Sequence, residues 1–154
     1  MDWFRIRHTI GLCFCMTGRK RADYLKKHHV LGAVGKNCMV MFRKVPLYPD
    51  LISMGDNVWI ASEVSFVTHD VIHRMLNNYG NYGLRENKGA IRIGNNVFVG
   101  AHSTLLPGVT IGDNTIIGAG SLVNKSIGNG VYAGVPAKYI CSFEDFIEKR
   151  KNQE

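Results

Sequence analysis

Two histidines stand four residues apart in the segment FVTHDVIH, which covers residues 66–73. On a helix, His69 and His73 would share one face, as the paired zinc ligands of a metalloprotease helix do. On a strand or in a loop the two side chains would diverge. One of them could then act as a lone general base, because histidine exchanges protons near neutral pH. The backbone around residue 69 therefore decides which chemistry is possible.

That backbone is predicted by a six-residue period, which is clearest from residue 93. The successive hexads are IGNNVF, VGAHST, LLPGVT, IGDNTI, IGAGSL and VNKSIG. Each begins with a branched aliphatic residue, and four of the six have glycine in second place. The same phase occurs in MGDNVW, IASEVS and FVTHDV. A weaker pair, VGKNCM and VMFRKV, begins at residue 34.

A period of six equals three steps of a β-strand and does not fit the 3.6-residue turn of an α-helix. Each hexad can form a short strand and a corner, with its aliphatic side chain inside, and three hexads close one triangular coil. Corners need tight or left-handed backbone, and the candidates are Gly94, Asn95, Asn96, Gly112, Asp113, Asn114 and Gly118. Stacked coils form a parallel β-helix. We therefore predict an all-β fold, a left-handed parallel β-helix of about four coils, with the handedness taken from the repeat type.

The length suits a single domain over residues 1–154. We expect a basic helical segment over 1–33, the β-helix over 34–140 and a short helix over 141–154. Residues 72–92 lose the hexad pattern and are predicted to form an excursion loop. Ser142 followed by Asp145 resembles the N-terminal cap of the last helix. Because a prism of four coils is thin, its flat faces are expected to be buried against other subunits.

The charge is concentrated near the N-terminus, where residues 1–50 hold ten Lys and Arg against three Asp and Glu. The run RKRADYLKKHH at 19–29 is interpreted as a solvated helix face or as a surface that attracts an anionic partner. No nucleic-acid recognition motif accompanies it. No apolar run approaches the ~20 residues of a membrane span, and no cleavage site follows the short apolar stretch at 9–18. We expect a cytoplasmic protein with reduced cysteines, no nucleic-acid partner and no membrane contact.

The chain resembles the bacterial hexapeptide-repeat acyltransferases of the galactoside, maltose and polysaccharide O-acetyltransferase type. The resemblance covers about residues 34–140 and is most specific in IGNNVFVGAHSTLLPGVTIGDNTIIGAGSLVNKSI and YAGVPAK. It implies a homotrimer with acetyl-CoA between adjacent subunits, no metal, and a sugar or glycan hydroxyl as acceptor. It also implies that the hydroxyl attacks the thioester directly while a histidine takes its proton.

Transferred to this sequence, the resemblance implies that His69 is the general base. The residues expected to contact CoA are Gly100, Ala101, Gly118, Ala119, Ser121, Lys125, Val135, Pro136 and Lys138. The two lysines would meet the CoA phosphates as point charges. The asparagine and aspartate that bind the sugar in the family have no clear match in VMFRKVPLYPD. Acceptor contacts are therefore expected more loosely, at Arg43, Asp50, His73, Arg74, Tyr79 and Tyr82.

Several alternatives remain open from the sequence alone. His73 could be the base if residues 72–92 fold differently, and Asp70 is interpreted as a corner residue. Within the acetyltransferases, the acceptor could be serine, an amino sugar or an antibiotic. A zinc enzyme of the γ-carbonic-anhydrase kind could use His69, His73 and His102 across a subunit interface, although a structural corner position is the simpler interpretation of His102. A third possible class of function is a non-catalytic β-helix that serves as a scaffold.

Overall fold

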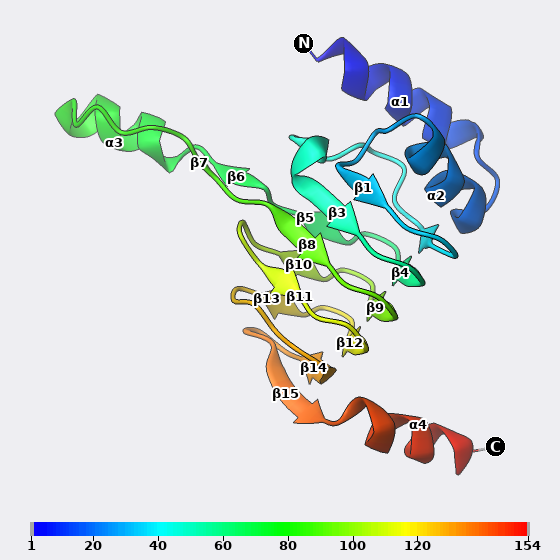
Figure 1. Cartoon of the computed structure of the whole chain (residues 1–154). Helices are drawn as coiled ribbons and strands as arrows, with labels where there is room; N and C mark the ends of the chain where they lie inside the picture. Colours follow the sequence, from blue (N-terminus) through cyan, green and yellow to red (C-terminus); the bar gives the residue numbers. More distant parts are fainter. Residues whose placement is uncertain (1, 154) are drawn as a thin grey trace.

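The hexads form a stack of triangular coils, as their period predicts (Figure 1). The computed structural model describes residues 2–153. The first sheet contains β1 (Ala33–Val34), β3 (Ile52–Met54), β8 (Ile91–Ile93) and β11 (Thr110–Ile111). The second contains β2 (Met39–Val40), β4 (Val58–Ile60), β9 (Val97–Val99), β12 (Thr115–Ile117), β14 (Gly130–Ala133) and β15 (Lys138–Cys141). The third contains β5 (Ser65–Phe66), β10 (Thr104–Leu105) and β13 (Leu122–Val123).

The interior of the stack is filled by the residues that open the hexads. Each is 4% exposed or less, and they are Ile93, Val99, Leu105, Ile111, Ile117 and Val123. The fifth hexad position is buried as well, and its hydroxyl groups are bonded inside the stack. Thr115 Oγ1, for example, donates to the carbonyl of Gly128 at 2.7 Å. Burial of each large aliphatic side chain contributes roughly 1.5–3 kcal/mol, so the repeated hexad position supplies the core.

An asparagine ladder holds the corner between the first and second sheets. Asn57, Asn96 and Asn114 have φ angles of 56°, 55° and 53°. Asn57 Nδ2 donates to Asn96 Oδ1 at 3.0 Å, and Asn96 Nδ2 donates to Asn114 Oδ1 at 2.9 Å. Of the two kinds of backbone predicted for the corners, tight or left-handed, Gly94, Gly112 and Gly118 do not adopt the left-handed one. These glycines allow close stacking instead: a Cβ on Gly94 would collide with the Asp113 carboxylate one coil away.

The excursion over residues 72–92 is a projecting arm (Figure 1). β6 (His69–Asp70) and β7 (Asn87–Lys88) pair antiparallel at its base, and α3 (Ile72–Gly80) forms its tip. The predicted loop is therefore wrong over the helical residues. The helix begins because Asp70 Oδ1 accepts the backbone N–H of Ile72 at 3.1 Å, and it ends at Asn81, which takes the left-handed conformation. His69 lies in a strand and His73 in a helix, so the two do not share a helix face.

Helices flank the stack at both ends of the chain. α1 (Trp3–Phe14) and α2 (Gly18–Lys27) lie beside the first coil, and a short 3-10 helix, η1 (Pro49–Leu51), precedes β3. The guanidinium of Arg21 is buried and donates to the carbonyls of Val40 and Cys15, both at 2.9 Å. This anchors α2 to the coil. The all-β description thus fits the stack rather than the whole chain.

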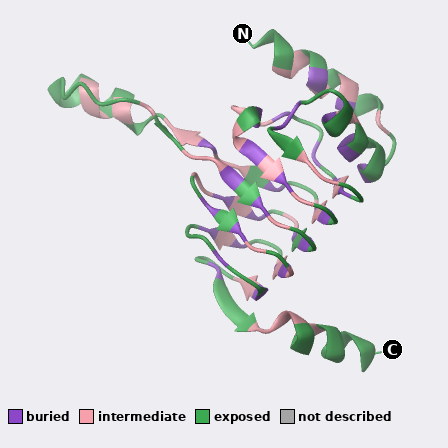
Figure 2. Cartoon of the chain, in the orientation of Figure 1, coloured by how far each residue is buried: buried purple, intermediate pink, exposed green. Residues whose placement is uncertain are grey.

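The C-terminal helix begins where the capping pattern predicts. In α4 (Phe143–Lys151), the hydroxyl of Ser142 accepts the N–H of Asp145 at 3.0 Å. No side chain of α4 is fully buried: Phe143 and Phe146 are half-buried and Ile147 is 38% exposed, and Figure 2 shows the helix mostly exposed. No helix in the described part of the chain combines the length and apolarity needed to cross a bilayer.

The asparagine ladder yields a stability test at Asn96. Asn96→Gly keeps the left-handed φ accessible and removes two side-chain hydrogen bonds, at a cost of about 1–2 kcal/mol. Asn96→Ala loses the same hydrogen bonds and also places alanine in the left-handed conformation, where its Cβ is crowded. This adds roughly 1–2 kcal/mol to the loss of stability. The free energy of unfolding measured in urea should therefore be highest for wild type, lower for Asn96→Gly and lowest for Asn96→Ala. Equal losses in the two variants would show that the φ angle of Asn96 contributes nothing.

Candidate functional site

His69 lies at the base of the arm, where the chain leaves the third sheet. The pairing of β6 with β7 places it opposite Lys88. Its ring packs edge-on against Tyr48, with ring centroids 5.1 Å apart and planes at 82°. Its Nδ1 atom is buried and has no hydrogen-bond partner within residues 2–153. Because buried polar atoms are nearly always paired, this nitrogen is an exception of the kind that functional sites contain.

Tyr48, Glu86 and Lys88 complete the cluster around His69, and sequence reasoning missed all three. The Tyr48 hydroxyl donates to the Glu86 carboxylate, 3.0 Å from each oxygen. Lys88 Nζ lies 3.1 Å from Glu86 Oε2 and 3.9 Å from the centre of the Tyr48 ring. Tyr48 has a φ of 49°, a costly conformation for a bulky residue that is often found at functional sites. The surrounding contacts therefore hold Tyr48 in place against His69.

The opposite charges of Glu86 and Lys88 stabilise each other. Loss of solvent raises the pKa of Glu86, but hydrogen bonds from Lys88 and Tyr48 outweigh it, so the pKa lies below its ordinary value. Hydrogen bonding to Tyr48 and Glu86 raises the pKa of Lys88. At neutral pH the cluster therefore contains a carboxylate and an ammonium group. Two features of the sequence could have indicated this cluster. Tyr48 lies in the segment VMFRKVPLYPD, which has no clear match to the family pattern. Glu86 and Lys88 stand two residues apart where the chain returns to the stack.

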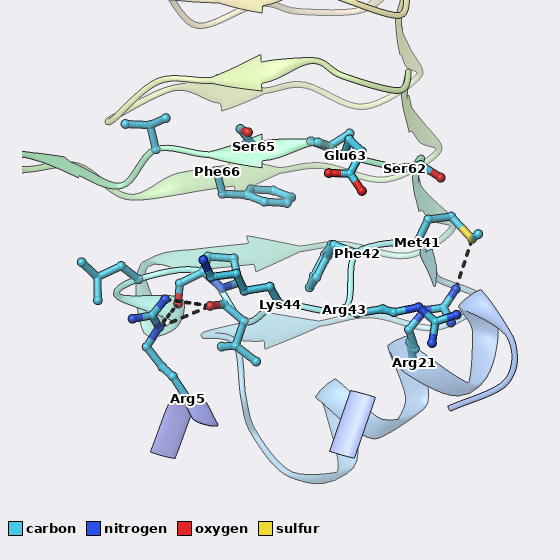
Figure 3. Close-up of a pocket in the computed structure, with 15 residues that line it drawn as sticks. Arg5, Arg21, Met41, Phe42, Arg43, Lys44, Ser62, Glu63, Ser65 and Phe66 are labelled. Carbon is cyan, nitrogen blue, oxygen red and sulfur yellow. Dashed lines mark hydrogen bonds between the residues drawn. The ribbon is translucent and has the colours of Figure 1, made fainter. Parts of the chain in front are cut away.

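A cavity of about 780 Å³ is lined mainly by residues 41–47 and 62–67 (Figure 3). It exists because residues 41–47 form no strand of the third sheet, which leaves β5 as the edge strand. Its walls include the rings of Phe42 and Phe66, with centroids 5.7 Å apart. Leu47 and Val67 also line it. Leu47 and Val67 are chain neighbours of Tyr48 and Thr68, but no residue of the His69 cluster lines the cavity.

The same cavity has a strongly cationic lining. Arg5, Arg21, Arg43 and Lys44 contribute to it, with Glu63 as its one acidic residue (Figure 3). Much of this charge is engaged by main-chain carbonyls. Arg5 Nε donates to Pro46 O at 2.9 Å, and Arg43 Nη1 donates to Cys13 O at 3.2 Å. Of the residues expected to contact the acceptor, Arg43 is the one that lines this cavity.

The other expected acceptor residues lie elsewhere. Asp50 is exposed in η1. His73 and Arg74 belong to α3, where His73 Nδ1 is buried without a partner among the described residues. Tyr79 and Tyr82 are 83% and 60% exposed and lie at or just beyond α3, at the tip of the arm (Figure 1). The structure therefore separates these two tyrosines from the His69 of their own chain.

The residues expected to contact CoA gather at the corner between the second and third sheets. Gly100 N donates to Ile117 O, and Gly120 N to Ala101 O, both at 2.8 Å. A Cβ on Gly100 would lie 2.5 Å from the backbone nitrogen of Ala119. Gly118 and Ala119 therefore stack directly against Gly100 and Ala101, and Ala119 is exposed. We call these four residues the small-residue corner.

Ser121 supports the small-residue corner from inside the stack. It is 1% exposed. Its hydroxyl donates to Gly118 O at 2.6 Å and accepts from Gly134 N at 3.2 Å, and its carbonyl accepts from Thr104 N at 2.8 Å. The expectation that Ser121 contacts CoA is not supported by this geometry, because its polar groups are engaged internally.

The remaining expected CoA contacts lie at the C-terminal end of the stack and are all exposed: Lys125, Val135, Pro136 and Lys138. Backbone hydrogen bonds from Leu122 N to Gly134 O at 3.0 Å and from Ala137 N to Leu122 O at 2.8 Å place this turn beside β13. The turn and the small-residue corner therefore belong to the same side of the prism.

His69 and the small-residue corner lie at different corners of one prism. His69 follows the third sheet, whereas the small-residue corner precedes it, so the third sheet lies between them. No three His, Cys, Asp or Glu side chains among residues 2–153 come together as a possible metal site. His102 takes a φ of 59° at an exposed corner.

Comparison with known proteins agrees with this geometry. The family model for the bacterial transferase hexapeptide (six repeats) matches residues 90–125. Galactoside O-acetyltransferase of Escherichia coli K12 is 42% identical over 115 residues, which are 73% of this chain and 54% of that protein. The chain thus matches about half the length of this relative.

Two solved structures share the fold over most of both chains. One is a galactoside acetyltransferase in complex with coenzyme A, with a TM-score of 0.69 and 30% identity over 96% of this chain and 88% of that one. The other is a maltose O-acetyltransferase from Clostridium difficile 630, with a TM-score of 0.60 and 28% identity over 92% and 89%. The chain therefore belongs to the hexapeptide-repeat acetyltransferase family, and that membership implies coils that wind left-handed.

Proposed function

We propose that the protein is an acetyl-CoA-dependent O-acetyltransferase that modifies a hydroxyl of a sugar or glycan. The observation that carries this proposal is His69 at the base of the arm, packed edge-on against Tyr48, with an imidazole nitrogen that has no hydrogen-bond partner among residues 2–153. Similarity to a galactoside acetyltransferase that was solved with coenzyme A supports acetyl-CoA as the cosubstrate. Similarity to galactoside and maltose O-acetyltransferases supports a sugar acceptor.

In the proposed reaction, His69 removes the proton from the acceptor hydroxyl as its oxygen attacks the thioester carbonyl. A C–O bond forms and the C–S bond breaks, so the acetyl group passes directly to the acceptor. The leaving thiolate takes the proton back from the imidazolium. A thioester is already activated, so the main contribution of the protein is a positioned base, which is typically worth ~10²–10⁴-fold in rate.

We further propose that the active site lies between two subunits of a homotrimer. One chain keeps His69 and the small-residue corner at different corners, so a second copy must bring them together. In this arrangement the small-residue corner of one subunit faces His69 of the next across a pantetheine-sized groove. Lys125 and Lys138 would meet the CoA phosphates, and Val135 and Pro136 would pack near the adenine. A closed symmetric ring repeats the same contact three times.

The cationic cavity is our proposed acceptor site. Its volume of about 780 Å³ lies in the range of roughly 300–1,000 Å³ that is common for small-molecule sites. Phe42 and Phe66 offer apolar surface to a sugar ring, and Arg43 offers donors to its oxygens. His73, Arg74, Tyr79 and Tyr82 sit on the arm, which could reach the acceptor of a neighbouring subunit.

Replacing His69 tests the proposed base. In His69→Ala, release of free CoA from acetyl-CoA with a panel of sugars and glycans should fall by ~10²–10⁴-fold, because the proton acceptor is gone. CoA binding, measured by calorimetry, should remain unchanged. His73→Ala is the matched comparison and should lose less turnover.

Undiminished turnover in His69→Ala would contradict the assignment, and a larger loss in His73→Ala would move the base to the arm. Stoichiometric zinc that disappears in His102→Ala would support the zinc-enzyme alternative instead. Failure of wild-type protein to bind CoA at all would favour the scaffold hypothesis.

The contact between Tyr48 and His69 makes Tyr48 a positioning residue for the proposed base. Tyr48→Leu removes the aromatic edge contact, which is worth up to about tenfold, so kcat should fall by about that factor while KM for acetyl-CoA stays constant. Tyr48→Phe keeps the ring and loses only the hydrogen bonds of the hydroxyl to Glu86 and Lys88, so most of kcat should return. Equal losses of kcat in both variants would contradict positioning by the ring.

A further inference from the structure

The first helix has a covered face and, directly opposite, an exposed apolar face. His8 and Leu12 are 3% and 0% exposed and pack inward. Trp3, Ile10 and Phe14 are 75%, 54% and 82% exposed. At about 100° per residue, these three lie within a stripe of roughly 40°, half a turn away from Leu12. Met16, which is 83% exposed, continues the apolar surface just beyond the helix.

The orientation of α1 is fixed by polar contacts on its covered face. His8 Nδ1 lies 3.0 Å from the hydroxyl of Tyr24 in α2. Burial lowers the pKa of His8, so this histidine is neutral at neutral pH. Arg5 bonds the carbonyls of Val45 and Pro46 through Nε and Nη2. Turning the apolar stripe inward would break these contacts, so the stripe stays on the surface.

One basic side chain lies on the face of the exposed stripe, and two more follow it in the sequence. Arg7 is on the same face of α1 between Trp3 and Ile10. Arg19 and Lys20 follow Met16 at the start of α2, where the Arg19 guanidinium lies 5.8 Å from the centre of the Trp59 ring. All three are exposed. The two ion pairs found within the described residues involve none of them. Aromatic and aliphatic groups on a surface helix, with cations beside them, match the composition of helices that lie in a membrane interface.

We propose that this face of α1 docks on the surface of an anionic lipid bilayer. Trp3, Ile10, Phe14 and Met16 enter the boundary between headgroups and acyl chains, while Arg7, Arg19 and Lys20 meet lipid phosphates. The helix lies in the plane of the interface and does not span it. This inference does not depend on acetyl transfer. It differs from the expectation of no membrane contact; the sequence alone left open whether the basic N-terminus touches a membrane, because it could not show which side of α1 is covered.

Charge favours a lipid surface over self-pairing of α1 as the occupant of this face. Pairing α1 with the same helix of a second copy would bring Arg7, Arg19 and Lys20 of each close to those of the other, and like charges across an interface oppose binding. An anionic bilayer is complementary to the same residues. The excess of ten basic over three acidic residues within positions 1–50 adds long-range attraction to such a surface.

Vesicle flotation of the full chain tests the proposal. The protein should float with vesicles of phosphatidylcholine and phosphatidylglycerol, bind poorly to phosphatidylcholine alone, and dissociate at high salt. Phe14→Ser should weaken binding by about tenfold or more, because it removes one inserted apolar side chain. Arg7→Glu should weaken it by more than about fivefold. Ile147→Ser, which alters an exposed apolar residue of α4, is the matched control and should bind as wild type.

Circular dichroism of each variant should show an unchanged fold. Absence of wild-type binding to the anionic vesicles would overturn the proposal, as would full binding by Phe14→Ser. If Phe14→Ser instead dissociates an oligomer in the absence of lipid, the face is a contact between subunits and the membrane proposal fails. CoA binding and acetyl transfer are measured separately, so neither result bears on the proposed function.

Discussion

The structure depends on one constraint: each strand of the three sheets pairs in parallel with the strand one coil away, except for the last strand, β15, which pairs antiparallel with β14. In the regular part of the stack, that partner lies 18 residues along the chain, as it does for Val97 with Thr115. Any residue that tilts or widens a coil would break the pairing on both sides. Three features of the sequence keep this pairing intact. Branched aliphatic residues fill the inside of the stack, asparagines take the left-handed conformation at one corner, and glycines stand where coils touch.

The same constraint explains how a reactive group can be held so close to an irregular segment. The arm interrupts a coil without shifting it, because Val67 N still donates to Leu105 O and Gly89 N donates to Thr68 O at the base of the arm, both at 2.9 Å. His69 is the first residue beyond this fixed point. Its position is therefore set by the stack, while its neighbours are contributed by segments that do not follow the repeat.

Sequence reasoning succeeded wherever the hexad phase determines the answer. The buried position of Ile111, the extended backbone at His69 and the cap at Ser142 all follow from patterns within a few residues. It failed where distant segments meet. The packing of Tyr48 on His69, with Glu86 and Lys88 around Tyr48, requires both the pairing of β6 with β7 and the path of residues 41–48. The helix in the arm was missed because its N-cap residue, Val71, offers no capping side chain.

In the proposed mechanism acetyl transfer depends on the homotrimer, since the base and the small-residue corner would come from different subunits. Mixed trimers of His69→Ala and Ala119→Trp test this claim directly. Ala119 is exposed, so tryptophan there should block the groove without disturbing the core. Each variant alone should be inactive. Random 1:1 mixing in a cyclic trimer should restore about one quarter of wild-type turnover, because that share of interfaces pairs an intact His69 with an intact corner. Mixed trimers that stay inactive would contradict the account.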